Sequence, residues 1–193
     1  MTNPLQSGNH PGPVVIALGS NLGDSTRLLG EAMDRLDALA LEPVHRSSIW
    51  RSTPLDCPPG SPVFANAVVV LIPRPDETPE SLLRRLQALE AEFGRRPKRV
   101  LNEARPLDLD IVHWHGETRS TPVLTVPHPR AHQRRFVLAP LAELAPGLVL
   151  PGQGLSIAEL LESAPPDPAL RRLAPSFSTS PNSAERESCT PGP

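Results

Sequence analysis

The sequence predicts an α+β protein, in which helices pack on an antiparallel sheet. Short apolar runs typical of buried strands alternate with two segments whose apolar residues recur at helical spacing. The order along the chain is strand, helix, strand, strand, helix, strand, which is the order of a ferredoxin-like sandwich. Two further apolar segments, 136–144 and 156–162, are predicted as short helices.

The first half of this pattern begins with the apolar run 14–18, which is predicted as a buried strand. Asp24 or Ser25 caps the helix that follows, and its apolar residues recur every three or four positions until the chain approaches Pro43. Residues 44–52 alternate enough to predict a second strand.

The second half follows a loop rich in Pro and Gly. Residues 64–72 form another apolar strand. Thr78 is the expected N-cap of the second helix, with Pro79 at its first position and Gly94 at its end. Residues 107–114 are then the last strand of the pattern.

A length of 193 residues suits one domain with a sizeable core. We expect this domain to span residues 13–164. Residues 165–193 are rich in Pro and Ser and show almost no apolar periodicity, so they are predicted to be a disordered tail. A disordered N-terminus is predicted at residues 1–12.

Composition disfavours several classes of protein. A formal net charge of -2 gives no net basic field for nucleic acid, and the apolar run 67–72 is far shorter than the ~20 residues of a membrane helix. Cys57 and Cys189 are too far apart in the chain for a metal-binding pair, and His113 and His115, without a third ligand, are expected to be solvent-exposed rather than to bind zinc. We expect a cytoplasmic monomer that binds neither nucleic acid nor membranes.

Asp108 and Asp110 are the first indication of chemistry. The strand period places both on one face, and Leu109 and Ile111 on the other. Neighbouring carboxylates repel each other unless a cation lies between them, and hard oxygen ligands favour Mg²⁺. A bare Asp-x-Asp pattern also occurs on solvated edge strands, so the surrounding residues must decide.

Cationic residues flank this pair on both sides along the chain. Carboxylates that hold Mg²⁺ beside guanidinium groups can neutralise a polyphosphate during phosphoryl transfer, although either cationic cluster alone is typical of a solvated surface. The clusters consist of Arg95, Arg96, Lys98, Arg99 and Arg105 before the strand, and of His128, Arg130, Arg134 and Arg135 after it.

Three motifs occur together in this chain: residues 17–24 (ALGSNLGD), 105–111 (RPLDLDI) and 126–128 (VPH). In this order and spacing they make the chain resemble the 6-hydroxymethyl-7,8-dihydropterin pyrophosphokinase family, from about residue 14 to residue 151. The resemblance implies a ferredoxin-like α+β sandwich. It also implies an enzyme of folate biosynthesis that transfers pyrophosphate from ATP to the pterin, with two Mg²⁺ ions, and releases AMP.

The resemblance also implies roles for individual residues. Asp108 and Asp110 would bind both metal ions, and Arg95 and Arg105 would complete the catalytic set by contacting the ATP phosphates. The flat pterin would stack between two phenylalanine rings. The residues implied in ATP binding are Glu90, Arg95, Lys98, Arg105, Thr125, His128 and Arg134, and those implied in pterin binding are Ser52, Thr53, Leu55, Phe64, Asn66 and Phe136.

Some of these roles have structural alternatives. Glu90 lies one turn after Leu86 against the apolar helix face, where an unpaired carboxylate would be costly. It therefore either lines the ATP site or pairs with an arginine of the fold. Phe64 and Phe136 could equally be core residues, and Asn66 could bind a structural partner.

The chain departs from the family pattern just before Arg105. Many relatives carry Arg-Trp-Gly-Pro there, whereas this chain has Leu101, Asn102, Glu103 and Ala104. Pro97 and Val123 stand where some relatives have Arg. These departures bear on rate and affinity more than on reaction type. Two alternatives remain: a nucleotidyltransferase that uses the same carboxylate-bound metals and releases pyrophosphate, and a noncatalytic ferredoxin-like binding module.

Overall fold

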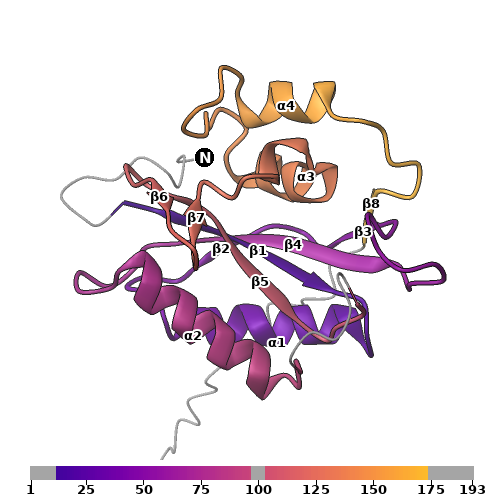
Figure 1. The fold of residues 1–193 in the computed structure, drawn as a ribbon, viewed down its shortest axis with the longest axis horizontal. Helices are drawn as coiled ribbons and strands as arrows, with labels where there is room; N and C mark the ends of the chain where they lie inside the picture. Colours follow the sequence, from indigo (N-terminus) through magenta and orange to yellow (C-terminus); the bar gives the residue numbers. More distant parts are fainter. Residues whose placement is uncertain (1–11, 97–102, 174–193) are drawn as a thin grey trace, which may run out of the picture.

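An antiparallel sheet with helices on both faces forms the core of the computed structural model, which describes residues 12–96 and 103–173 (Figure 1). The path of paired strands runs β5 (Asp108–Trp114), β1 (Val14–Ser20), β4 (Phe64–Leu71), β3 (Trp50–Ser52) and β8 (Arg171–Arg172). β2 (His45–Arg46) also pairs with β4. The order β5-β1-β4-β3 is that of a ferredoxin-like sheet, so the predicted fold class is confirmed.

β1 is the central strand, and its pairing with β4 and β5 places polar residues of the neighbouring strands beside one end of β1. Val14, Val15 and Ile16 are fully buried because helices cover both faces of the sheet. At the other end of β1 the register places Gly19 opposite Asp108 of β5 and, on its other side, opposite Asn66 of β4. Small and polar residues of three strands therefore meet at one end of the sheet.

Two helices, α1 (Ser25–Asp37) and α2 (Pro79–Glu92), cover one face of the sheet (Figure 1). Their start signals act as predicted. The Asp24 side chain accepts a hydrogen bond from the Arg27 backbone, and Thr78 forms a capping box with Ser81. The apolar face that these helices bury includes Leu29, Met33, Leu36, Leu82, Leu86 and Leu89.

The opposite face carries α3 (Arg135–Leu144) and, packed on it, α4 (Ile157–Ser163). A short 3₁₀ turn, η1 (Ala131–Gln133), precedes α3. Both short helices predicted in this region are therefore present. Within the described residues, no helix is long and apolar enough to cross a membrane. The core on this side includes Val15, Val68, Val70, Leu138, Leu141 and Leu150.

The predicted strand at 44–52 is wrong as one element, because it is interrupted between β2 and β3. Arg46 lies opposite Val69 and Trp50 opposite Asn66, so residues 47–49 face only residues 67 and 68. At this bulge the Ser47 hydroxyl accepts the backbone N–H of Val68, in place of the carbonyl that a regular ladder would supply.

Part of the predicted tail is described, and this part packs on the sheet. Residues 171 and 172 form β8 beside β3, and Leu173 packs against the core. A backbone pairing of this kind leaves no apolar repeat in the sequence, which is why the sequence analysis placed these residues in the tail. The remainder of the predicted tail, 174–193, and residues 1–11 lie outside the described residues.

His113 is buried, contrary to the expectation of an exposed residue. His113 lies at a β-bulge, because the register between β1 and β5 shifts between the pair Ile16 and Ile111 and the pair Val15 and His113. Helices cover both faces of the sheet here, and His113 is only 5 % exposed. Burial, and to a smaller extent the charge of His115, lowers the pKa of His113 to about 4.

Candidate active site

Asp108 and Asp110 lie at the beginning of β5 and face the side of the sheet that carries α3. The alternation of β5 places Leu109 between them in the opposite core, as predicted. Burial raises the pKa of Asp110, and the neighbouring charge of Asp108 raises it further. A cation that binds between the two carboxylates would therefore stabilise the ionised form of Asp110.

Two arginines already contact Asp108. Arg95 Nη1 lies 2.5 Å from Oδ1, and Arg105 Nη2 lies 2.8 Å from Oδ2. The side chains of Arg95, Arg105 and Asp108 are all less than a fifth exposed, so little solvent screens their attraction. Arg95 follows α2 and Arg105 precedes β5, so the two guanidinium groups reach Asp108 from separate segments.

Glu90 is buried on α2 and has partners within the fold. Its carboxylate contacts the Arg95 guanidinium, and Oε1 accepts the backbone N–H of Leu109 at 2.7 Å. Burial raises the pKa of Glu90 to about 7, although the Leu109 N–H and Arg95 oppose this shift. The alternative of an arginine partner is therefore present in the structure, and Glu90 holds Arg95 beside Asp108.

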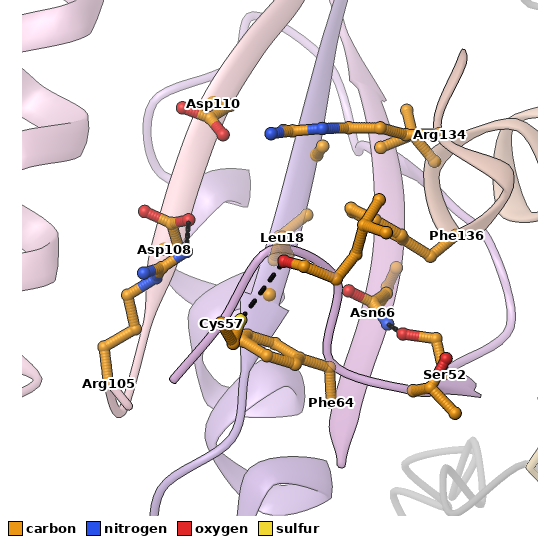
Figure 2. Close-up of a pocket in the computed structure, with 16 residues that line it drawn as sticks. Leu18, Ser52, Cys57, Phe64, Asn66, Arg105, Asp108, Asp110, Arg134 and Phe136 are labelled. Carbon is orange, nitrogen blue, oxygen red and sulfur yellow. Dashed lines mark hydrogen bonds and ion pairs between the residues drawn. The ribbon is translucent and has the colours of Figure 1, made fainter. Parts of the chain in front are cut away.

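A pocket lies next to the two aspartates, between the sheet and the start of α3 (Figure 2). The space between its lining side chains, open solvent included, is about 640 Å³. Ala17 and Gly19 of β1 belong to its lining, and the small size of these residues keeps it open. The other lining residues are Leu18, Ser52, Thr53, Leu55, Cys57, Phe64, Asn66, Ala67, Arg105, Asp108, Asp110, Arg134, Phe136 and Val137.

Phe64 and Phe136 both line this pocket, from β4 and α3 respectively. Each ring has a guanidinium near one face. Arg105 Cζ lies 5.8 Å from the Phe64 centroid, and Arg134 Cζ lies 5.6 Å from the Phe136 centroid. A flat electron-poor ring bound in this pocket could therefore contact both aromatic rings and the guanidinium groups beside them.

Asn66 is the polar group at the centre of the pocket wall. Its Nδ2 donates to the Ser52 hydroxyl at 2.9 Å, which fixes the orientation of the amide. Its Oδ1 is directed into the pocket in Figure 2. Ser52 is thus the structural partner of Asn66, one of the two alternatives in the sequence analysis. The Asn66 Oδ1 can still accept a hydrogen bond from a ligand.

Asn21 is a residue whose role the sequence analysis did not identify. It is 3 % exposed, and it exchanges two hydrogen bonds with Arg105: the Arg105 N–H donates to Asn21 Oδ1 at 2.9 Å, and the Asn21 N–H donates to the Arg105 carbonyl at 3.1 Å. Asn21 Nδ2 also donates to the Pro62 carbonyl at 3.4 Å. The only sequence signal for Asn21 was its place in the motif 17–24.

A second, more open depression lies on the other side of Asp110. Thr125 and His128 line it with Asp110. The His128 N–H donates to the Val112 carbonyl at 2.9 Å, which ties this segment to β5. Burial lowers the pKa of His128 and the arginines nearby lower it further, although Asp110 opposes them. Neutral imidazole is therefore favoured here.

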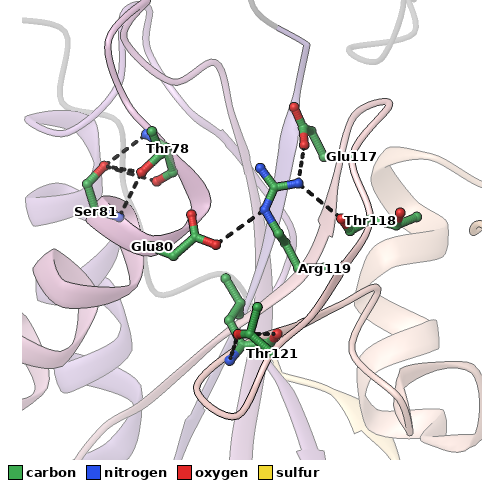
Figure 3. A network of polar contacts seen from close by, with 8 residues as sticks. Thr78, Glu80, Ser81, Glu117, Thr118, Arg119 and Thr121 are labelled. Atoms are coloured by element: carbon green, nitrogen blue, oxygen red, sulfur yellow. Dashed lines mark hydrogen bonds and ion pairs between the residues drawn. The ribbon is translucent and has the colours of Figure 1, made fainter.

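The depression borders a hairpin of β6 (Arg119–Ser120) and β7 (Thr125–Val126), which is fastened to α2 (Figure 3). Arg119 Nε donates to Glu80 in the first turn of α2 at 3.2 Å, and Nη1 donates to Glu117 at 2.5 Å. Nη1 also donates to the Thr118 carbonyl at 3.0 Å. The contact with Glu80 holds the hairpin against α2, and Thr125 belongs to this hairpin.

The structure thus brings the two aspartates, Arg105 and all six implied pterin residues into one pocket, and Arg95 contacts Asp108 without lining the pocket. Arg134, implied in ATP binding, lies in that pocket beside Phe136, whereas Thr125 and His128 lie across Asp110. Lys98 lies outside the described residues. Cys57 lines the pocket without having been predicted, because no pattern distinguishes a loop cysteine of this kind.

The donor set of the site fits Mg²⁺ that arrives with a phosphate ligand. Within residues 12–96 and 103–173, no group of three or more His, Cys, Asp or Glu side chains is placed to hold a metal. Mg²⁺ is commonly bound through one or two carboxylates together with substrate phosphates. Asp108 and Asp110 are a pair of this kind.

Comparison with known proteins places the chain in a family. The model of the family described as 7,8-dihydro-6-hydroxymethylpterin-pyrophosphokinase (HPPK) matches residues 15–146. The 2-amino-4-hydroxy-6-hydroxymethyldihydropteridine pyrophosphokinases of Haemophilus influenzae and Synechocystis sp. are 39% and 37% identical to it. These matches cover 76% and 77% of this chain, and 89% and 74% of the relatives.

Longer proteins contain the same region. The folic acid synthesis protein fol1 of Pneumocystis carinii is 36% identical over 77% of this chain, which spans only 20% of that relative. A crystal structure of Plasmodium falciparum HPPK-DHPS shares the fold with a TM-score of 0.63 at 14% identity. The matched region covers 83% of this chain and 47% of the Plasmodium falciparum chain. The chain therefore belongs to the 7,8-dihydro-6-hydroxymethylpterin-pyrophosphokinase family, the ATP-dependent kinases that transfer pyrophosphate to 6-hydroxymethyl-7,8-dihydropterin in folate synthesis.

Proposed function

We propose that this chain carries out its family's reaction in the pocket between Phe64 and Phe136, with the ATP phosphates beside Asp108 and Asp110. The observation that carries the proposal is that one continuous space contains both aromatic rings and both carboxylates. A pterin bound against the rings would have its hydroxymethyl group directed toward the acids. Proximity of this kind is a large part of the catalysis of phosphoryl transfer.

The pterin would be recognised by stacking and by hydrogen bonds. Phe64 and Phe136 supply the flat surfaces, and Asn66, held by Ser52, supplies an amide for the polar edge of the heterocycle. Thr53 and Leu55 line the same pocket. The pairing of a rigid amide with two rings favours a planar amide-bearing ligand over a sugar or an extended peptide.

The carboxylates would hold the magnesium that accompanies ATP, and we propose two ions, bound by Asp108 and Asp110. Metal bound there supplies charge neutralisation for the migrating pyrophosphoryl group. Arg95 and Arg105 would exchange their contacts with Asp108 for phosphate oxygens. Glu90 would keep Arg95 close to the site during this exchange, because the Leu109 N–H holds its carboxylate in place.

In the proposed reaction the hydroxymethyl oxygen forms a bond to the β-phosphorus of ATP and releases its proton to solvent. The bond from that phosphorus to the oxygen bridging the α- and β-phosphates breaks in line, and AMP leaves with this oxygen and the bonding electrons. Thr125 and His128, across Asp110 from the pterin side, would bind the nucleotide. Arg134 lies over Phe136 and could approach either substrate.

We also propose that the chain acts as a monomer. Sedimentation equilibrium tests this: a dimer at micromolar concentration would contradict it. ATP as co-substrate favours the cytoplasm as its place of action.

Product analysis tests the function directly. The purified chain is incubated with ATP, Mg²⁺ and 6-hydroxymethyl-7,8-dihydropterin, and nucleotides are separated by ion-exchange chromatography. We expect AMP in amounts equal to the pyrophosphorylated pterin, and none when pterin or Mg²⁺ is omitted. Release of pyrophosphate instead would indicate a nucleotidyltransferase. Absence of both products, with pterin still bound, would indicate a noncatalytic binding module.

A further inference from the structure

Residues 165–173 cross the edge of the sheet after α4 and end beside β3 (Figure 1). β8 pairs antiparallel with β3, with Arg172 opposite Trp50 and Arg171 opposite Arg51. The Leu173 N–H then donates to the Ile49 carbonyl at 2.8 Å. This segment, the C-terminal strap, therefore covers a strand that would otherwise be the open edge of the sheet.

Before it reaches β3, the strap contacts the residue that follows this strand. The Thr53 N–H donates to Asp167 Oδ2 at 3.1 Å. Asp167 is itself fixed by a turn, because Oδ1 accepts the Ala169 N–H at 2.9 Å and its carbonyl accepts the Leu170 N–H at 3.0 Å. A rigid acceptor thus holds the backbone at the end of β3.

The other end of the strap is joined to α3 through Glu143. The Glu143 carboxylate accepts hydrogen bonds from the Ser48 N–H at 2.7 Å and from Trp50 Nε1 at 2.9 Å. Arg172 Nε lies 3.2 Å from the same carboxylate. One acid of the helix that carries Phe136 therefore binds both β3 and the strap, so β3 is held from two directions.

What the strap holds is a wall of the pterin pocket. Ser52, Thr53 and Leu55 line the pocket, and the Ser52 hydroxyl orients the Asn66 amide. Residue 54 is a proline and has no N–H to donate, so Thr53, directly after β3, supplies the last backbone N–H before this proline. The far end of this loop is held separately, where Asn21 Nδ2 donates to the Pro62 carbonyl.

We propose that the C-terminal strap positions the end of β3 for pterin binding, with Asp167 as the positioning residue. Asp167 does not line the pocket, and it acts through Thr53. The proposal rests on the proposed function for its substrate. It predicts a defect confined to the pterin side, because Thr125 and His128 belong to a separate segment across Asp110.

The test uses the full chain with Asp167→Ala, and with Asp167→Asn as the conservative variant that keeps an oxygen acceptor. Removing one backbone hydrogen bond is expected to raise the KM for pterin roughly 3- to 10-fold. The KM for ATP should stay within about twofold of wild type, and Asp167→Asn should recover most of the loss. Glu162→Ala, which removes an exposed carboxylate of α4, is the matched control and should change neither constant.

Leu173→Pro tests the other end of the strap, because proline cannot donate to the Ile49 carbonyl, whereas Leu173→Ala keeps that N–H and loses only packing. The proline variant should also raise the KM for pterin, and by more than the alanine variant. A pterin KM within about twofold of wild type in both Asp167→Ala and Leu173→Pro would overturn the proposal.

Hydrogen exchange separates this proposal from the proposed function. The Thr53 amide should exchange faster in Asp167→Ala than in wild type or in Asp167→Asn, whether or not the protein turns over. A wild-type protein that releases no AMP would refute the proposed function alone. Unchanged exchange at Thr53 in Asp167→Ala would refute the positioning role alone.

Discussion

Arg95 and Asp108 bind each other directly, with Arg95 Nη1 2.5 Å from Asp108 Oδ1. Arg105 binds the second oxygen of the same carboxylate at 2.8 Å. A metal ion bound by these oxygens would compete with the two guanidinium groups, and a displaced guanidinium would lie beside the proposed phosphate site. Asp108 and Asp110 therefore differ in what they do for the fold, although both are proposed to bind metal.

Asp108→Ala and Asp110→Ala should both abolish AMP release, because each removes a proposed ligand of both ions. Their stabilities should differ. Asp108→Ala removes the carboxylate that Arg95 and Arg105 share, although Arg95 keeps Glu90, and should lower the free energy of unfolding by about 1 to 3 kcal/mol. Asp110→Ala removes a carboxylate whose pKa burial raises, so it should leave stability unchanged or increase it.

Urea unfolding in the presence of EDTA measures this difference, with AMP release followed separately. Near wild-type turnover in either variant would contradict the metal assignment. Equal destabilisation of both variants would show that the contacts of Arg95 and Arg105 with Asp108 contribute little.

Phe64→Ala and Phe136→Ala should each weaken pterin binding by about 1 to 3 kcal/mol, the range for loss of a stacking ring. Binding of ATP alone should change much less. Isothermal calorimetry with each ligand provides the comparison. Phe93→Ala, which removes a ring outside the pocket, is the control and should spare pterin affinity. Equal losses for both ligands would indicate that the rings are core residues.

Acid should destabilise the protein through His113. Burial lowers the pKa of this side chain in the folded state to about 4, from its usual 6.5, so the unfolded chain binds the extra proton between these values. The stability that neutral His113 contributes is complete above pH 6.5 and is lost as the pH falls toward 4. The loss is up to about 3 kcal/mol.

His113→Gln cannot gain this proton, so its free energy of unfolding should fall less steeply between pH 6.5 and 4. Urea titrations at several pH values, without metal, give the slope. His45→Gln, at an exposed position of β2, should keep the wild-type slope. If His113→Gln kept it as well, other buried groups would have to account for the acid sensitivity.

Two truncations test the boundary of the folded domain. Ending the chain after residue 164 removes the strap and should lower the free energy of unfolding by about 1 to 2 kcal/mol, since β8 pairing and the packing of Leu173 are lost. Ending it after residue 173 should leave the melting temperature nearly unchanged, because residues 174–193 contain few apolar side chains that could pack on the domain. Equal melting temperatures for both truncations would show that the strap adds no stability.

The amino-acid sequence alone was enough to predict the family, its reaction and the order of the main elements. Local signals sufficed for this, because they act over a few residues. Thr78 and Pro79 start α2 as predicted, and the alternation through Asp108 and Asp110 places both acids on one face of β5. Three short motifs in fixed order then distinguished the family where the Asp-x-Asp pattern alone could not.

The partners of these residues depend on contacts between distant segments. The bulge at Ser47 and the register shift at His113 depend on how neighbouring strands pair, and strand alternation within one segment contains no information on that. The polar segment of the strap becomes ordered through its backbone and through the contact of Asp167 with Thr53, without an apolar repeat. Contacts between residues more than a hundred positions apart exist only once the sheet has brought both segments together.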